Sequence, residues 1–104
     1  MGISKKDQFG LGQNQIAKIA RCLSHPARIA ILELILARKE PICNDIVSEL
    51  PLAQATISQH LKELKKIGII EGRMQGTKVC YSIDKEVWQF YKKILNDFFK
   101  KIDF

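Results

Sequence analysis

The chain has 104 residues, of which 46% are hydrophobic, and it carries a formal net charge of +6 at pH 7. This length favours a single domain, and this apolar content argues against intrinsic disorder. The basic balance favours an acidic partner, with nucleic acid ahead of a membrane surface; the alternative is a merely soluble basic protein.

Neither a membrane span nor a secretion signal is visible in the sequence. No apolar run approaches the roughly 20 residues that cross a bilayer, and the N-terminal MGISKKDQFGLGQ lacks an apolar core. The three cysteines, Cys22, Cys43 and Cys80, are widely spaced and form no Cys-x-x-Cys motif. We therefore expect no disulfide framework, no membrane partner and a cytoplasmic protein with reduced cysteines.

The N-terminal region divides into an arm and a first helix. Residues 1–12 contain glycine and lysine without hydrophobic periodicity. They predict a flexible arm, followed by one domain over residues 13–104. Ile16, Ile19 and Leu23 then recur at helical spacing and predict the first helix.

Two further helices follow a break at SHP. Ser24 is a predicted cap, and Pro26 suits the first turn of a helix over about 26–38. This helix is apolar on nearly all sides, which favours a central, buried position. A short helix is predicted over about 42–49, with Cys43 on its buried stripe as a small core residue.

The next stretch, LAQATISQHLKEL at residues 52–64, predicts a helix over about 53–67 with two different faces. One face is apolar, and Gly68 ends the helix. The other face is mostly uncharged and short-chained: Gln54, Thr56, Ser58, Gln59 and Lys62. Short polar side chains let a helix approach base edges closely, and glutamine can pair with adenine. The alternative is an ordinary solvated surface.

The hydrophobic period then changes to that of strands. IIEGRM and KVCYSI predict a β-hairpin around Gln75-Gly76-Thr77. In its second strand the alternation predicts Val79, Tyr81 and Ile83 facing inward, and Lys78, Cys80 and Ser82 facing outward.

Asp84 is a predicted cap for the last helix, over about 85–102. Its apolar stripe is too wide for so small a protomer to cover: Val87, Phe90, Tyr91, Ile94, Leu95, Phe98, Phe99 and Ile102. An uncovered patch of this kind predicts an interface, and we expect a homodimer. The alternative is that the helix packs only on its own domain. That packing explains the apolar residues on one face of the helix.

A short helix, a tight turn, a polar-faced helix and a basic hairpin form a winged helix-turn-helix pattern. The predicted fold is mainly α with a small β-hairpin, in the order α-α-α-α-β-β-α. Residues 53–83 carry five basic and two acidic side chains, a net charge of +3, whereas residues 40–52 carry three acidic side chains and no basic ones. Arg73 and Lys78 flank the hairpin tip and are candidates for phosphate or minor-groove contacts.

The segments CLSHPARIAILELI and LPLAQATISQHLKELKKIGIIEGRMQGTKVCYSI resemble the ArsR/SmtB family of bacterial winged-helix repressors. The resemblance covers about residues 14–102. It implies a homodimer built from the first and last helices, and two recognition helices on an inverted-repeat operator in double-stranded DNA. It also implies that a signal ligand releases the DNA.

The resemblance also assigns residues to these roles. The implied DNA-binding residues are Gln54, Ala55, Thr56, Ser58, Gln59, His60 and Lys62 on the recognition helix, and Arg73, Gln75, Thr77 and Lys78 on the wing. The implied dimerisation residues are Ile16, Ile19, Leu23, Val87, Tyr91, Ile94, Leu95 and Phe98.

The metal sites of the family are not retained in this sequence, so we expect no metal cofactor. One class of relatives uses Cys-x-Cys in the short helix, and those positions are Ile42 and Asn44 here. Another class uses acidic and histidine ligands on the last helix, which lacks histidine and cysteine in this chain. A tight transition-metal site usually needs imidazole or thiolate.

The signal is therefore left open. Cys80, near Arg73 and Lys78, and Cys22, on a flank of the first helix, are candidate redox sites. A small organic inducer, or no ligand at all, is the other alternative. A winged helix can also serve as an interaction module for protein or RNA. No catalytic set of side chains and no phosphate-binding loop is present, and we predict no enzyme.

Overall fold

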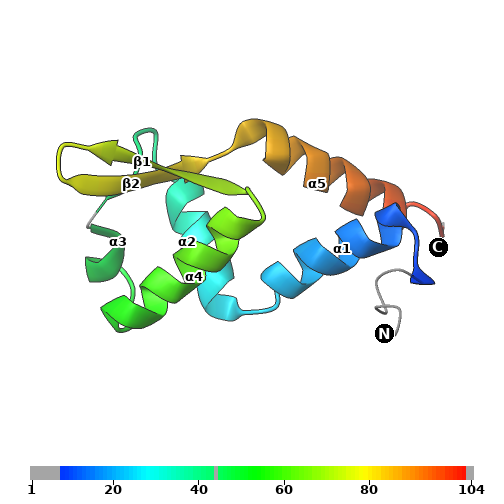
Figure 1. The fold of residues 1–104 in the computed structure, drawn as a ribbon, viewed down its shortest axis with the longest axis horizontal. Coiled ribbons are helices and arrows are strands. Elements are labelled where there is room, and N and C mark those ends of the chain that lie inside the picture. Colours follow the sequence, from blue (N-terminus) through cyan, green and yellow to red (C-terminus); the bar gives the residue numbers. More distant parts are fainter. Residues whose placement is uncertain (1–7, 44, 103–104) are drawn as a thin grey trace, which may run out of the picture.

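A computed structural model of the chain describes residues 8–43 and 45–102. Its elements, in chain order, are α1 (Leu11–Cys22), α2 (Pro26–Leu36), α3 (Asp45–Ser48), α4 (Gln54–Lys66), β1 (Ile70–Gln75), β2 (Lys78–Ile83) and α5 (Lys85–Phe99). The predicted order of helices and strands is confirmed. Figure 1 shows α1 lying along α5 at one end of the molecule, with α2, α3, α4 and the hairpin at the other.

Local signals account for three of the helix ends. Pro26 is the first residue of α2, and Gly68, with a φ of 85°, lies just beyond α4. The Asp84 carboxylate accepts hydrogen bonds from the backbone N–H groups of Glu86 and Val87 at the start of α5. The predicted cap by Ser24 is wrong, because its hydroxyl donates to the carbonyl oxygen of Arg21 at the end of α1.

Three boundaries differ from the prediction. Helix α1 begins at Leu11, within the predicted arm, whose residues 1–7 lie outside the described part of the chain. Helix α5 ends at Phe99. Helix α3 is only four residues long. The chain ahead of α3 is extended because Ile42 pairs with Tyr81 of β2, with N–O distances of 3.0 and 2.8 Å in the two directions.

The core lies where α1, α2, α4 and the hairpin meet. Its most deeply buried side chains include Ile19, Ile31, Ile57, Leu64 and Ile70. They belong to α1, α2, α4 and β1, so one apolar cluster holds α4 against the rest of the domain. Burying side chains of this size stabilises a fold by about 1.5–3 kcal/mol each relative to exposing them.

The hairpin is antiparallel, with Ile70 opposite Ile83 and Gln75 opposite Lys78. A two-residue loop joins the strands, and its Gly76 has a φ of 66°, which glycine adopts without strain. The prediction of which β2 side chains point toward the core is partly wrong. Cys80 is buried, with 2% of its surface exposed, whereas Val79 is 38% exposed.

Candidate nucleic-acid interface

Helix α4 presents a polar face to solvent above a buried apolar stripe. Ile57, Leu61 and Leu64 are buried beneath it. The predicted DNA-binding residues that are exposed on this helix are Gln54, Ala55, Thr56, Ser58, Gln59 and Lys62. The Gln59 amide donates to the Glu63 carboxylate at 3.3 Å, one helical turn further on. The buried stripe fixes the rotation of α4, so these side chains face outward together.

His60 differs from its neighbours on α4 because it is half-buried and has a protein partner. Its Nδ1 accepts a hydrogen bond from Nε of Arg28 at 3.1 Å, and its ring lies 5.6 Å from that of His25. Burial, followed by the positive charges of Arg28 and His25, lowers the pKa of His60 below its ordinary value. Arg28 also donates to the Cys22 carbonyl at 3.3 Å, so it links α1, α2 and α4.

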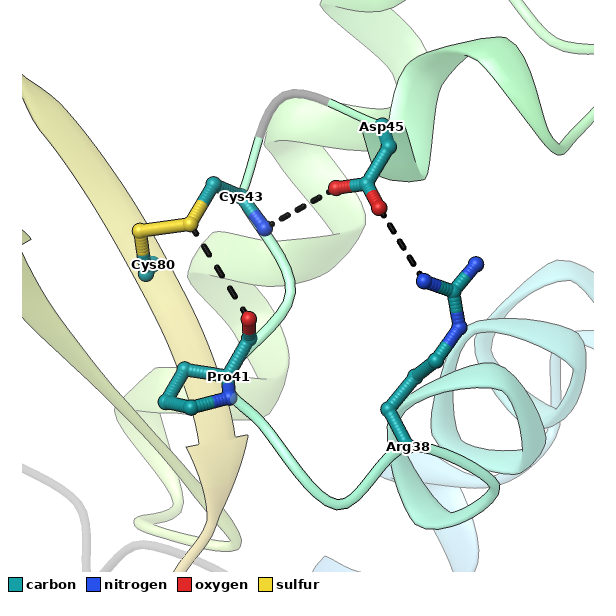
Figure 2. Close-up of a disulfide and its surroundings, with 5 residues drawn as sticks. All are labelled: Arg38, Pro41, Cys43, Asp45 and Cys80. Atoms are coloured by element: carbon teal, nitrogen blue, oxygen red, sulfur yellow. Dashed lines mark hydrogen bonds and ion pairs between the residues drawn. A yellow bond between two sulfur atoms is a disulfide. The ribbon is translucent and has the colours of Figure 1, made fainter.

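A second arginine positions α3. Arg38, just after α2, pairs with Asp45 at 3.1 Å and with Glu49. These carboxylates lie at the two ends of α3, and the Asp45 carboxylate also accepts from the Cys43 backbone N–H at 3.2 Å (Figure 2). Sequence reasoning missed the roles of both Arg28 and Arg38. Their partners are 32, 7 and 11 residues away, and no short motif reports such pairs.

The hairpin carries the second group of predicted DNA-binding residues, all of them exposed: Arg73, Gln75, Thr77 and Lys78. The Arg73 guanidinium lies 3.4 Å from the Glu71 carboxylate, and its side chain is 77% exposed. A pair this exposed is weak, so Arg73 stays available to a stronger anion such as a phosphate. The hairpin thus presents two cations beside its glycine turn.

Two of the three cysteines contradict the expectation of reduced thiols, because Cys43 and Cys80 form a disulfide (Figure 2). Ile42 and Tyr81 exchange both backbone hydrogen bonds, so the next two residues, Cys43 and Cys80, are directly opposite each other. Such non-hydrogen-bonded pairs bring the backbones close. Here the two Cα atoms are 4.1 Å apart.

Cys22, the other candidate redox residue, is a buried free thiol in the core. Burial raises the pKa of this thiol, and the nearby Arg28 lowers it by less. A thiol that stays protonated and buried is a poor nucleophile. Across residues 8–43 and 45–102, no three His, Cys, Asp or Glu side chains are grouped to hold a metal ion. In the same residues, no helix is long and apolar enough to cross a bilayer.

The predicted dimerisation residues differ in how deeply they are buried in the protomer. Ile19 and Tyr91 are buried within the protomer, and Phe98 is 45% exposed. The others are half-buried: Ile16, Leu23, Val87, Ile94 and Leu95. Six exposed apolar side chains lie on α1, on α5 or within a few residues of these helices: Phe9, Leu11, Phe90, Phe98, Phe99 and Ile102. We call this set the apolar end.

Comparisons with known proteins agree with this geometry. Residues 23–73 match a family described as a helix-turn-helix domain. An uncharacterized HTH-type transcriptional regulator, MJ1325 of Methanocaldococcus jannaschii, is 36% identical over 79 residues, which are 75% of this chain and 89% of that protein. The similar regulator Rv0081 of Mycobacterium tuberculosis is 36% identical over 67 residues, which are 64% of this chain. That match spans only 59% of the length of Rv0081.

Solved structures share the fold. The crystal structure of M. tuberculosis Rv0081 superposes with a TM-score of 0.66 at 28% identity, over 88% of this chain and 96% of that one. A solution structure from Mycobacterium bovis superposes with a TM-score of 0.66 at 22% identity, over 99% of this chain and 94% of that one. Its description is a homodimeric winged helix-turn-helix DNA-binding domain of a possible ArsR-family regulator.

Proposed function

Because the chain belongs to the ArsR/SmtB family of helix-turn-helix transcriptional regulators, we propose that it is a homodimeric, sequence-specific DNA-binding regulator. Its action is repression, as in the transcriptional repressor SmtB of Mycobacterium tuberculosis, to which it is 36% identical over 66 residues. Its partner is an inverted-repeat operator in double-stranded DNA, and it acts in the cytoplasm, where that DNA lies. A signal releases it from the operator.

The exposed, mostly uncharged polar face of α4 carries this proposal. Gln54, Ser58 and Gln59 lie on the solvent side of a helix that is held from below by buried side chains. A rigid helix with short polar groups can enter a major groove and form hydrogen bonds to base edges. Gln59 exchanges its contact with Glu63 for a base when it binds.

The wing adds affinity without reading sequence. Arg73 and Lys78 are exposed on the hairpin, on either side of its turn. Their charges suit phosphates that flank the groove in which α4 lies. Each phosphate contact of this kind makes binding weaker at higher salt.

The apolar end supports the homodimer. Phe99 and Leu11 are 72% and 75% exposed, and they lie on the last turn of α5 and the first turn of α1. Exposed apolar patches of this kind mark protein interfaces, and a second copy of the same face is self-complementary. A dimer formed there carries one α4 on each protomer, which suits two half-sites.

The test is selection from a pool of randomised duplexes with the purified chain at moderate salt. We expect enrichment of an inverted repeat whose half-sites are about one helical turn, roughly 34 Å, apart. The double substitution Gln54→Ala and Gln59→Ala should abolish this preference and leave salt-dependent non-specific binding, because phosphate contacts remain.

The matched control is Gln89→Ala, which removes an exposed glutamine from α5 and should leave the selected motif unchanged. Wild-type protein that enriches no motif would contradict the proposal, and an interaction module for protein or RNA would replace it. A double variant that still enriches the same motif would contradict the assignment of base reading to α4.

A further inference from the structure

The Cys43–Cys80 disulfide joins two parts of the molecule that the proposed function brings to DNA together. Cys43 lies in the segment that leads into α3, and Cys80 lies in β2 of the wing. Figure 2 shows the bridge between the extended segment and the strand, beside Asp45 at the start of α3. The bridge therefore connects the helix-turn-helix to the wing.

The contacts around Cys43 extend this connection to α2 and α3. Asp45 accepts from the Cys43 backbone N–H at 3.2 Å and pairs with Arg38 at 3.1 Å. On the other side, the backbone pair between Ile42 and Tyr81 holds the same segment to β2. Without the sulfur–sulfur bond, the Ile42–Tyr81 pair is the backbone pairing, among the described residues, that holds the segment to the hairpin.

The two cysteines differ in exposure. Cys80 is 2% exposed, whereas Cys43 is half-buried. A small thiol therefore reaches the sulfur of Cys43 first. The Cys43 Sγ lies 4.0 Å from the carbonyl oxygen of Pro41, which can accept a weak hydrogen bond from the thiol once the bridge is reduced. A reduced Cys43 therefore has a backbone acceptor nearby.

We propose that Cys43 and Cys80 form a thiol–disulfide exchange site for low-molecular-weight thiols and disulfides, and that it sets the affinity for the operator. The oxidised form binds tightly, because the bridge holds α3–α4 and the wing in one arrangement. The reduced form binds weakly, because the wing is held to the segment by fewer constraints. This inference rests on the proposed function and supplies its signal.

The exchange is balanced in both directions. In reduction, a small thiolate attacks the Cys43 sulfur, the Cys43–Cys80 bond breaks, and the electron pair leaves on Cys80, which takes a proton. A second small thiolate then attacks the mixed disulfide at the sulfur of the bound small molecule, releasing Cys43 and a small-molecule disulfide. In oxidation, the same small-molecule disulfide is reduced to two thiols while the protein bridge forms.

Compartment and accessibility favour a reversible bridge. Disulfides in proteins that work on cytoplasmic DNA are usually transient or redox-sensing, except in hyperthermophiles. The bridge lies at a partly accessible position beside the surface that is proposed to contact DNA. If the untethered wing holds its bound position about one tenth of the time, the dissociation constant rises about tenfold on reduction.

The test uses the full chain equilibrated with mixtures of reduced and oxidised glutathione. Acid quenching and thiol alkylation followed by mass spectrometry give the fraction of protein with the bridge, and binding of the selected duplex gives the affinity. We expect the bridged fraction to follow the glutathione ratio, and the reduced protein to bind about tenfold more weakly. Cys43→Ser and Cys80→Ala should each bind like the reduced protein under all mixtures.

The control is Cys22→Ala, which removes the remaining thiol and should retain the full redox response. A bridge that persists in every mixture would identify a structural staple and overturn the inference. If the bridged and reduced wild-type proteins bind the operator with equal affinity, the bridge does not regulate DNA binding and this inference is wrong, while the proposed function remains intact. A lack of sequence preference in both redox forms would overturn the proposed function itself.

Discussion

At the scale of single residues, the clearest feature of the proposed interface is the pair formed by Arg28 and His60. The Arg28 side chain donates to Nδ1 of His60, so a neutral His60 carries its hydrogen on Nε2. That N–H is then the donor that His60 can offer to DNA. Protonation of Nδ1 removes the acceptor and places two cations side by side.

This pair predicts a pH dependence of stability. Burial and the charges of Arg28 and His25 lower the pKa of folded His60, so the unfolded chain takes up this proton at a higher pH than the folded one. The free energy of unfolding should therefore fall as the pH is lowered through the ordinary histidine range, and level off above it. Urea unfolding at pH values from about 5 to 8, which bracket the ordinary histidine pKa, measures this free energy for the wild type and for His60→Gln.

The substitution should flatten this dependence, because glutamine does not titrate. The same pH profile in both proteins would mean that another group is responsible.

At the scale of elements, caps and turn residues position the helices that bear the site. Where β2 passes into α5, Oδ1 of Asp84 accepts hydrogen bonds from the backbone N–H groups of Glu86 and Val87, with an N–O distance of 3.1 Å in each. It thereby fixes the direction in which α5 leaves the wing and returns along α1. The Asp84 backbone N–H also donates to the Ile69 carbonyl at 3.0 Å, so this residue closes the base of the hairpin as well.

We expect Asp84→Ala to lower the free energy of unfolding by about 1 kcal/mol, because the first turn of α5 loses its side-chain acceptor. Thermal or urea denaturation followed by circular dichroism measures the change. Asp97→Ala is the matched control. It removes only an exposed ion pair with Lys93, at 3.0 Å one turn away on α5, and should cost less than about 0.5 kcal/mol. Equal losses in the two variants would argue against capping.

At the scale of the whole molecule, the proposed function assigns different tasks to the two ends of the domain. Helix α4 and the wing lie at one end of the ribbon, and α1 and α5 lie at the other (Figure 1). The exposed polar side chains are on α4, and the residues of the apolar end are on or next to α1 and α5. The buried core between them includes Ile19, Ile57 and Tyr91, which belong to α1, α4 and α5. Dimerisation at one end can therefore set the distance between two copies of α4 at the other.

The double substitution Phe90→Glu and Phe99→Glu should convert the proposed dimer into a folded monomer. Both side chains are exposed in the protomer, at 45% and 72%, so their charge disrupts an interface without entering the core. Sedimentation velocity measures the assembly, and operator affinity should fall with it because a monomer reaches only one half-site. Met74→Glu, at a 63% exposed position on the wing, is the control and should stay dimeric. A double variant that remains a dimer would place the interface elsewhere.

Several features could be predicted from the sequence alone because they depend on local chemistry. Apolar residues at helical spacing predicted α1, α2, α4 and α5, and alternation with a central glycine predicted the hairpin. Gly68 and Asp84 correctly marked the end of α4 and the start of α5. The solvent-facing side of α4 was also predicted, because a helix with one apolar stripe leaves the opposite face to water. The roles of its residues on DNA stay a prediction.

Only the tertiary structure decided which distant residues meet. Cys43 and Cys80 are 37 residues apart, and they pair because Ile42 is in backbone register with Tyr81. This register also buries Cys80, against the alternation of its strand. Periodicity reports which face of one element is apolar, but not which segment comes to lie against it. For this protein, the sequence by itself determined the winged helix and the polar, solvent-facing side of α4, and the folded chain decided the link between that helix pair and the wing.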